Sequence, residues 1–243
     1  MHKTSVRAGV LLYLAEMTRR YQGLAFGVRF DQLNWPGYPK RNVDLMVRKM
    51  VEGGEVRLVR GVLRITSVGE HLLKVVHPAR LYRDRNWDGQ WRLVTFVIPE
   101  QRRVKRNQLR TYLALTGFGR WQQSVYVTTH PMLDLVREYA KHLGIERYME
   151  DWTMEVMGQG SVQQFGERVF EMEARTLAWK ELVLQARGVK GRGEMREIMR
   201  IWQQLLLSDP YLPVELGLNK SDKFKQELLS EMEGWVTNAK NWG

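Results

Sequence analysis

The chain has 243 residues, of which 44% are hydrophobic and 27% charged, so a globular protein with a sizeable core is expected and extensive disorder is excluded. It has no cysteine, which excludes disulfides, thiolate metal sites and a cysteine nucleophile. Residues 1–80 hold 14 basic and 6 acidic side chains, whereas residues 159–243 hold 12 of each. This basic N-terminal part favours a polyanionic partner.

The apolar run Val10–Ala15 is interrupted by Glu16 and is too short to span a membrane. No small-residue cleavage site follows it, as a signal peptide would require. We therefore expect a soluble cytoplasmic protein with no membrane partner.

The N-terminal elements begin with an amphipathic helix over residues 5–18 and leave room for a short helix around Phe30–Leu33. In the segment Lys40–Glu52, apolar residues recur with the spacing of one helix face. Two β-rich runs around Gly61 then indicate a hairpin, and Val68–Val76 is expected to form a helix.

This order of helix, short helix, basic helix, basic hairpin and helix is typical of a winged helix-turn-helix, which we assign to residues 1–80. Such a domain inserts one helix into the major groove and lays its hairpin along the DNA backbone. The alternative is that these charges are solvated residues on amphipathic elements. The candidate DNA-binding residues are Lys40, Arg41, Asn42, Arg48 and Lys49 on the helix, and Arg57, Arg60 and Arg64 on the hairpin.

Residues 86–158 predict alternating strands and helices. The expected elements are a strand over Trp91–Ile98, a helix over Glu100–Thr116, a strand over Arg120–Thr128, a helix opened by His130-Pro131, and a strand over Trp152–Met157. This order fits a small ferredoxin-like α+β module, although the pattern shows no fourth strand.

Residues 159–243 are expected to form a helical C-terminal domain, with helices over Val162–Arg187, Glu194–Leu207 and Phe224–Trp235. The whole chain is therefore predicted to be an α+β protein of three domains, 1–80, 86–158 and 159–243.

Three stretches of the chain have a distinctive sequence. The first is Trp-Asp-Gly-Gln-Trp-Arg-Leu-Val at 87–94, followed by Phe-Val-Ile-Pro-Glu at 96–100. The second combines Gly117-Phe118-Gly119 with Ser-Val-Tyr-Val at 124–127, and the third is Leu-Ser-Asp-Pro-Tyr-Leu-Pro-Val-Glu-Leu at 207–216. Together they resemble the PaaX family of bacterial transcriptional repressors over residues 1 to about 230.

The resemblance implies a winged helix, a Cas2-like ferredoxin domain and a helical C-terminal domain, acting as a homodimer on double-stranded DNA. The best-known members of the family repress phenylacetate degradation operons and release DNA on binding phenylacetyl-CoA. This chain departs from the family at Thr128-Thr129-His130-Pro131 and after the Asp-Pro-x-Leu-Pro signature, where Gly217–Asp222 lacks the second proline and the tryptophan. We therefore expect DNA binding to be retained, while the effector stays open.

A small-molecule effector, such as a CoA thioester, is expected near the central and C-terminal domains, with Arg102, Arg103 and Arg106 as partners for a CoA phosphate. Those arginines could instead form a dimer contact or a second nucleic-acid surface. We predict no catalytic residue, metal site or cofactor, because the sequence has no zinc spacing, P-loop, dinucleotide fingerprint or nucleophile elbow.

Two alternatives follow from the same observations. Cas2-like proteins include metal-dependent nucleases and scaffolds linked to CRISPR adaptation, which would require a carboxylate such as Glu100 where the nucleases place an aspartate. The other alternative is an architectural DNA-binding protein without sequence preference.

Overall fold

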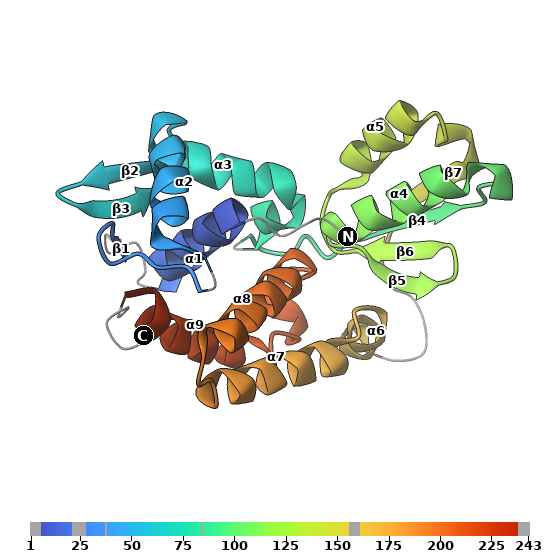
Figure 1. Ribbon diagram of the computed structural model, residues 1–243. Coiled ribbons are helices and arrows are strands. Elements are labelled where there is room, and N and C mark those ends of the chain that lie inside the picture. The colour runs from blue at the N-terminus through green and yellow to red at the C-terminus, as the bar shows by residue number, and fades with distance from the viewer. Residues whose placement is uncertain (1–5, 21–27, 37, 84, 156–160, 238–243) are drawn as a thin grey trace. The chain divides into compact units, whose positions relative to one another are not determined.

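The computed structural model describes residues 6–20, 28–36, 38–83, 85–155 and 161–237. It is a mixed, helix-rich α/β structure with two antiparallel sheets (Figure 1). No helix in these ranges has both the length and the apolar composition needed to cross a membrane. The chain divides into two compact units, one built from residues 1–75, 176–206 and 221–243, and the other from residues 76–175 and 207–220.

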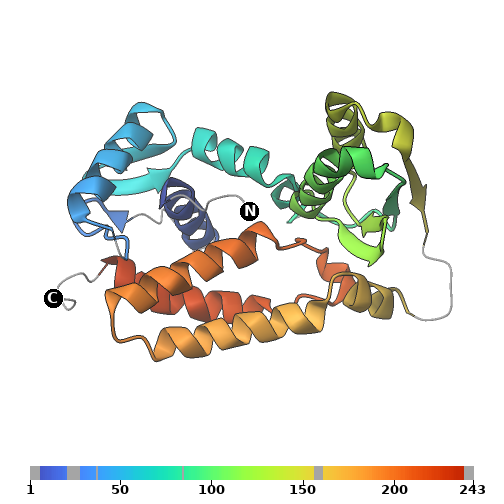
Figure 2. The same ribbon diagram turned by 45° about the vertical axis from the view of Figure 1, so that its right-hand side comes forward.

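The first unit begins with six elements, which include the expected longer helices and hairpin and, in addition, a short strand at Val28–Arg29 that the sequence did not predict. They are α1 (Val6–Arg20), β1 (Val28–Arg29), α2 (Lys40–Glu52), β2 (Val56–Val59), β3 (Val62–Ile65) and α3 (Ser67–Val76). The three strands form an antiparallel sheet in the order β1-β3-β2, and β2 and β3 are joined by a two-residue turn at Arg60-Gly61. Helix α2 lies beside this hairpin (Figure 2).

The short helix expected around Phe30–Leu33 is not present. The chain makes a single turn there, in which the backbone N–H groups of Gln32 and Leu33 both donate to the carbonyl oxygen of Arg29. The segment 34–39 that leads into α2 contains Pro36, Gly37 and Pro39, which do not continue a helix.

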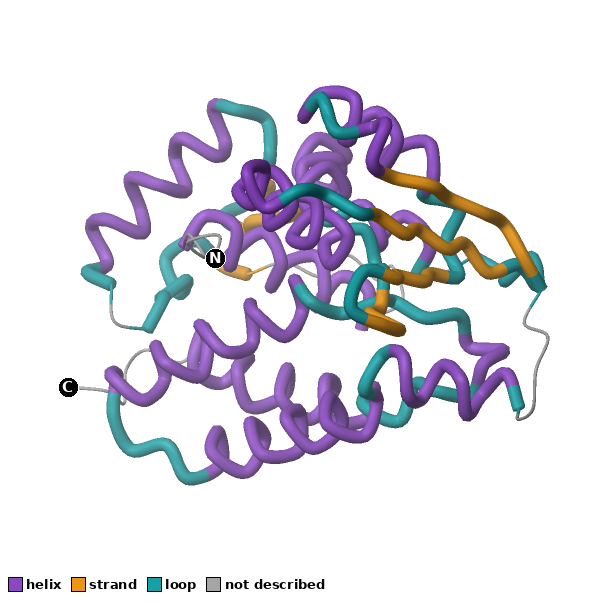
Figure 3. Tube along the Cα trace, turned by 90° about the vertical axis from the view of Figure 1, so that its right-hand side faces the viewer, coloured by secondary structure: helices purple, strands orange, loops and turns teal. Residues whose placement is uncertain are grey.

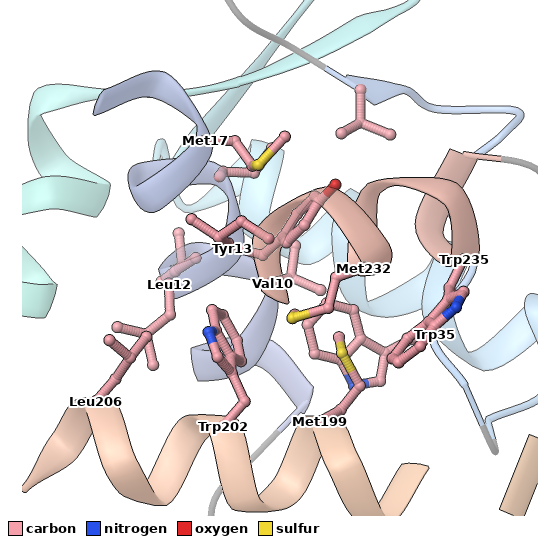
Figure 4. Packing of buried hydrophobic residues seen from close by; sticks show 14 of the residues in the cluster. Val10, Leu12, Tyr13, Met17, Trp35, Met199, Trp202, Leu206, Met232 and Trp235 are labelled. Atoms are coloured by element: carbon pink, nitrogen blue, oxygen red, sulfur yellow. The ribbon is translucent and has the colours of Figure 1, made fainter. Parts of the chain in front are cut away.

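Helices from the C-terminal part of the sequence complete the core of the first unit. They are α8 (Arg192–Leu207), α9 (Asp222–Thr237) and most of α7 (Met172–Arg187). Figure 4 shows Trp202 and Leu206 of α8 and Met232 of α9 directed toward Leu12 and Tyr13 of α1. Because it is covered from several sides, α1 buries residues around most of its circumference.

The second unit contains a β-α-β-β-α-β module. Its elements are β4 (Trp91–Phe96), α4 (Arg103–Leu115), β5 (Gly119–Gln122), β6 (Val125–Thr128), α5 (Leu133–Leu143) and β7 (Met149–Met154). The strands form an antiparallel sheet in the order β5-β6-β4-β7, which is the ferredoxin-like arrangement (Figure 3). The sequence pattern showed three strands because the expected strand Arg120–Thr128 is in fact two. The chain folds back at Gln123-Ser124, which separates β5 from β6.

Both faces of this sheet are partly covered. Helices α4 and α5 pack on the face that carries Val94 and Phe96. Near Trp91, the other face is covered by α6 (Val162–Val169) and by the segment 212–218, which contains the 3-10 turn η4 (Val214–Leu216). Three further 3-10 turns complete the unit: η1 (Pro78–Tyr82), η2 (Glu100–Arg102) and η3 (Glu146–Tyr148).

The single helix expected over Val162–Arg187 is broken into α6 and α7. The break lies at Glu171, whose φ of 50° is incompatible with a continuing right-handed helix. Helix α6 belongs to the second unit, and α7 continues into the first. Residues 159–243 are thus shared between the two units, and independent folding of the three expected domains stays a prediction.

Candidate nucleic-acid interface

Helix α2 carries a basic face opposite its buried face. Val43, Val47 and Met50 are buried in the core of the first unit, which fixes the rotation of the helix about its axis. The outward face therefore presents polar and basic side chains to solvent, together with Leu45, which is 52% exposed. The exposed predicted contacts on this face are Arg41, Asn42, Arg48 and Lys49.

Lys40 differs from the other predicted contacts because its ammonium group is held within the unit. The Nζ atom donates to the carbonyl oxygens of Phe30 and Leu33, each at 2.9 Å, and to Oδ1 of Asp44 at 2.7 Å. It also lies 5.2 Å from the ring centroid of Phe30. These contacts satisfy the three donors of the ammonium group, so Lys40 fixes the turn before α2 against the first turn of the helix.

The hairpin places its three predicted arginines in two ways. Arg57 of β2 lies directly opposite Arg64 of β3, on the face away from the buried Val56 and Leu63. Arg60 lies at the tip, in a turn where it and Gly61 have φ values of 50° and 78°. Both positive angles are characteristic of a type I′ hairpin turn, which favours asparagine or glycine rather than arginine.

The basic charges of α2 and the hairpin are not neutralised locally. Among the described residues, no ion pair involves Arg41, Arg48, Arg57 or Arg60, and Nε of Arg64 is buried without a hydrogen-bond partner. Helix α2 has two acidic residues, and Asp44 is already bound by Lys40. No ion pair to a described residue therefore neutralises the arginines of this basic surface, and Glu52 is the remaining carboxylate of α2.

The predicted effector residues Arg102, Arg103 and Arg106 do not converge on one point. Nη1 of Arg102 donates to the carbonyl oxygen of Gly144, and its guanidinium lies over Tyr148. Arg103 is exposed and lies 3.9 Å from Glu100. Arg106 instead donates to Glu100 and to the backbone of Ile98. Arg110 was not among the predicted effector residues, although it lies one helical turn beyond Arg106 and this spacing places both on one face of α4.

The carboxylate proposed for a nuclease is engaged by arginine. Oε2 of Glu100 accepts a hydrogen bond of 2.7 Å from Arg106, which together with the nearby Arg103 lowers the pKa of Glu100. In the part of the chain that the structure describes, no group of three or more His, Asp or Glu side chains could hold a metal ion. Glu100 is therefore paired with cations and belongs to no described cluster of acidic ligands.

Two buried histidines of the second unit, His77 and His130, are held by contacts with neighbouring residues. The Nε2 atom of His130 lies 2.7 Å from the carbonyl oxygen of Pro210, and its ring stacks on Tyr82. His77 packs edge-on against Tyr211. Burial lowers the pKa of both histidines to about 4, so both are neutral at pH 7.

These observations define a helix-rich α/β protein that combines a basic helix–hairpin surface with a ferredoxin-like module. Residues 84–165 match the family model of the PaaX protein central Cas2-like domain. This part of the chain thus matches the central Cas2-like domain of PaaX proteins, as the resemblance to that family implied.

Two further comparisons concern the whole chain. The uncharacterized protein Rv0674 from Mycobacterium tuberculosis has a similar structure, with a TM-score of 0.52 and 17% sequence identity. The alignment covers 92% of this chain and 97% of that one, and at this identity the similarity shows the fold alone. No curated protein matches the chain.

Proposed function

We propose that the protein is a sequence-specific DNA-binding transcriptional regulator of the PaaX type, whose residues 1–80 act as a winged helix-turn-helix. The observation that carries this proposal is the basic surface of α2 and the β2–β3 hairpin, whose arginines form no ion pair with a described residue. The central Cas2-like domain supports it, because that domain is characteristic of PaaX-type regulators.

In this proposal α2 is the recognition helix. A helix fits the major groove, where each base pair presents a distinct pattern of donors and acceptors. Arg41, Asn42 and Arg48 supply donors for base edges and phosphates, and Lys49 adds charge on the same exposed side. Lys40 acts by positioning the helix, because its own donors are used within the unit.

The hairpin is the wing and contacts the DNA backbone through Arg57, Arg60 and Arg64. Phosphate contacts release condensed counterions, so binding weakens steeply as salt is raised. We propose that the protein binds as a homodimer, so that two recognition helices read two half-sites of a palindromic or near-palindromic operator.

The regulator is proposed to act in the cytoplasm as a repressor, without catalytic activity, and to be released by a small molecule. The family resemblance favours an acyl- or aryl-CoA thioester as the effector. Such a ligand can release DNA only if it binds more tightly to a DNA-incompetent arrangement of the dimer.

Footprinting on the DNA upstream of the protein's own gene tests this function, at near-physiological salt and with competitor DNA. We expect a protected inverted repeat with the wild-type protein and loss of protection with Arg48→Ala. Arg200→Ala is the matched control, since Arg200 is exposed on α8 and paired with Glu197. Equal affinity for the protected sequence and for scrambled duplexes would contradict sequence-specific regulation.

A further inference from the structure

The second unit contains a hollow where β4 ends and the chain turns into α4. Its volume is about 340 Å³, within the range of small-molecule sites, and it is open to solvent. The turn between β5 and β6 forms its other wall. Eight residues line it: Phe96, Val97, Ile98, Glu100, Arg106, Arg110, Gln123 and Ser124.

Two arginines on successive turns of α4 dominate the charge of this hollow. Arg106 is largely enclosed, with 21% of its side chain exposed. Its Nη1 donates to the carbonyl oxygen of Ile98 at 3.3 Å and its Nη2 to Glu100 at 2.7 Å, while Nε is buried without a partner. Arg110 is half-buried, and its Nε is likewise buried without a partner among the described residues.

The lining therefore holds two guanidinium groups but a single carboxylate, that of Glu100. Partly desolvated charges without a counter-ion are costly, and this cost falls when an anion binds. Gln123 and Ser124 add an amide and a hydroxyl group that can donate hydrogen bonds at the opposite wall. Val97, which is 83% exposed, supplies an apolar surface beside these donors.

We propose that this hollow is a binding site for a small organic anion, whose phosphate or carboxylate group is held by Arg106 and Arg110. Guanidinium groups suit such oxygens because their planar donors match the spacing of two anionic oxygens. The exposed Val97 contacts the apolar part of the same molecule. Glu100 competes with the ligand for Arg106, so it lowers the affinity of the site. The site is distinct from the DNA-binding surface and does not depend on DNA binding.

Calorimetric titration of the full chain with inorganic phosphate, phenyl phosphate and benzoate tests this site. We expect measurable binding of phenyl phosphate or benzoate, and tighter binding of phenyl phosphate than of inorganic phosphate. Arg110→Gln should weaken binding about tenfold or more, the loss expected for one charge-assisted hydrogen bond. Arg110 is the residue to change because the structure gives it no ion pair to a described residue, so folding should tolerate the substitution.

Two further variants separate binding from general effects of charge. Arg103→Gln is the matched control, because Arg103 lies on the same helix but is 71% exposed and does not line the hollow. It should change the affinity less than about twofold, since exposed charges are strongly screened. Glu100→Gln should strengthen binding, which a merely structural role for these residues would not produce.

Other outcomes would overturn the proposal. One is the absence of binding of all three probes at about 10 mM, a concentration that would nearly saturate a site with a dissociation constant of about 1 mM. Another is an affinity for phenyl phosphate that is the same in wild type and Arg110→Gln. If Arg110→Gln instead leaves probe binding unchanged and weakens double-stranded DNA binding as much as Arg48→Ala, the arginines bind a nucleic-acid backbone. A failed footprint with intact binding of phenyl phosphate would overturn the regulator and leave this site standing.

Discussion

Arg57 and Arg64 lie directly opposite each other across the β2–β3 hairpin, so two positive charges face each other on adjacent strands. Like charges that face each other across antiparallel strands destabilise the pair. Burial of Nε of Arg64 adds to this cost. A phosphate group bound between the two guanidinium groups would reverse the sign of the interaction, which connects the hairpin register to the proposed DNA contact.

Replacing Arg57 with threonine should therefore stabilise the free protein and weaken its complex with DNA. We expect a gain in the free energy of unfolding of about 0.2–1 kcal/mol, because the repulsion is removed and threonine favours strands. The salt dependence of DNA binding should fall by about one phosphate contact. Urea unfolding and DNA titrations at several salt concentrations measure the two effects. Unchanged DNA affinity would mean that Arg57 is merely solvated.

At the hairpin tip, the backbone strain of Arg60 can be tested separately from the proposed role of its charge in DNA binding. Arg60 adopts a φ of 50° in a turn that favours asparagine. Arg60→Asn should raise the free energy of unfolding by up to about 1 kcal/mol, because asparagine tolerates the left-handed conformation better. Thermal unfolding and DNA titration would be compared with those of Arg60→Lys, which keeps the charge and the strain. Equal loss of DNA affinity in both variants would contradict a role for the charge at this tip.

Arg48 should distinguish base reading from backbone contact. If its guanidinium binds a base edge, Arg48→Ala should reduce discrimination between operator and random DNA by about 1–3 kcal/mol. Competition binding with both duplexes at one salt concentration gives this value directly. Equal weakening on both duplexes would show that Arg48 contacts phosphate alone.

The sequence predicts those elements whose boundaries carry a local chemical signal. Helix α2 follows Lys40–Glu52 because Val43, Val47 and Met50 have helical spacing and Gly53-Gly54 ends the segment. The turn at Gln123-Ser124 has neither glycine nor proline, so the two strands it joins read as one. The break at Glu171 likewise has no glycine or proline beside it, so no local residue marks it in the sequence.

The exposed residues of the candidate interface were predictable from local sequence signals, whereas the role of Lys40 was not. Arg41 and Arg48 are exposed because they lie opposite the buried face of a helix with clear periodicity, and Arg57 lies on the largely exposed strand β2. The donors of Lys40, in contrast, reach carbonyl oxygens in a turn seven to ten residues earlier, and no local pattern encodes that contact.

The core of the first unit also depends on contacts that are distant in sequence, which makes a fragment experiment informative. The isolated fragment 1–80 lacks α8 and α9, so Leu12, Tyr13 and Met17 of α1 would lose part of their cover. We expect it not to unfold cooperatively, as judged by circular dichroism during urea titration. A sharp unfolding transition of the fragment would instead support an independent N-terminal domain.

In the full chain, Trp202→Ala should lower the free energy of unfolding by about 3–5 kcal/mol.

The two buried histidines of the second unit should make the protein sensitive to mild acid. Their pKa of about 4 in the folded state lies below the ordinary value of 6.5. The unfolded state therefore binds more protons between these values. The contribution of each histidine is fully present above pH 6.5 and is lost progressively as the pH falls toward 4. At pH 5 the loss should be about 2 kcal/mol for each histidine.

His77 allows this sensitivity to be assigned, because neither of its ring nitrogens has a described hydrogen-bond partner. His77→Phe should keep the stability measured at pH 8 to within about 1 kcal/mol, since no hydrogen bond is lost. The variant should also lose about half of the decrease between pH 8 and pH 5, measured by urea unfolding. His142→Gln is the control, because His142 is exposed on α5 and should leave the profile unchanged. An unaltered pH profile in His77→Phe would show that His77 does not have a depressed pKa in the folded protein.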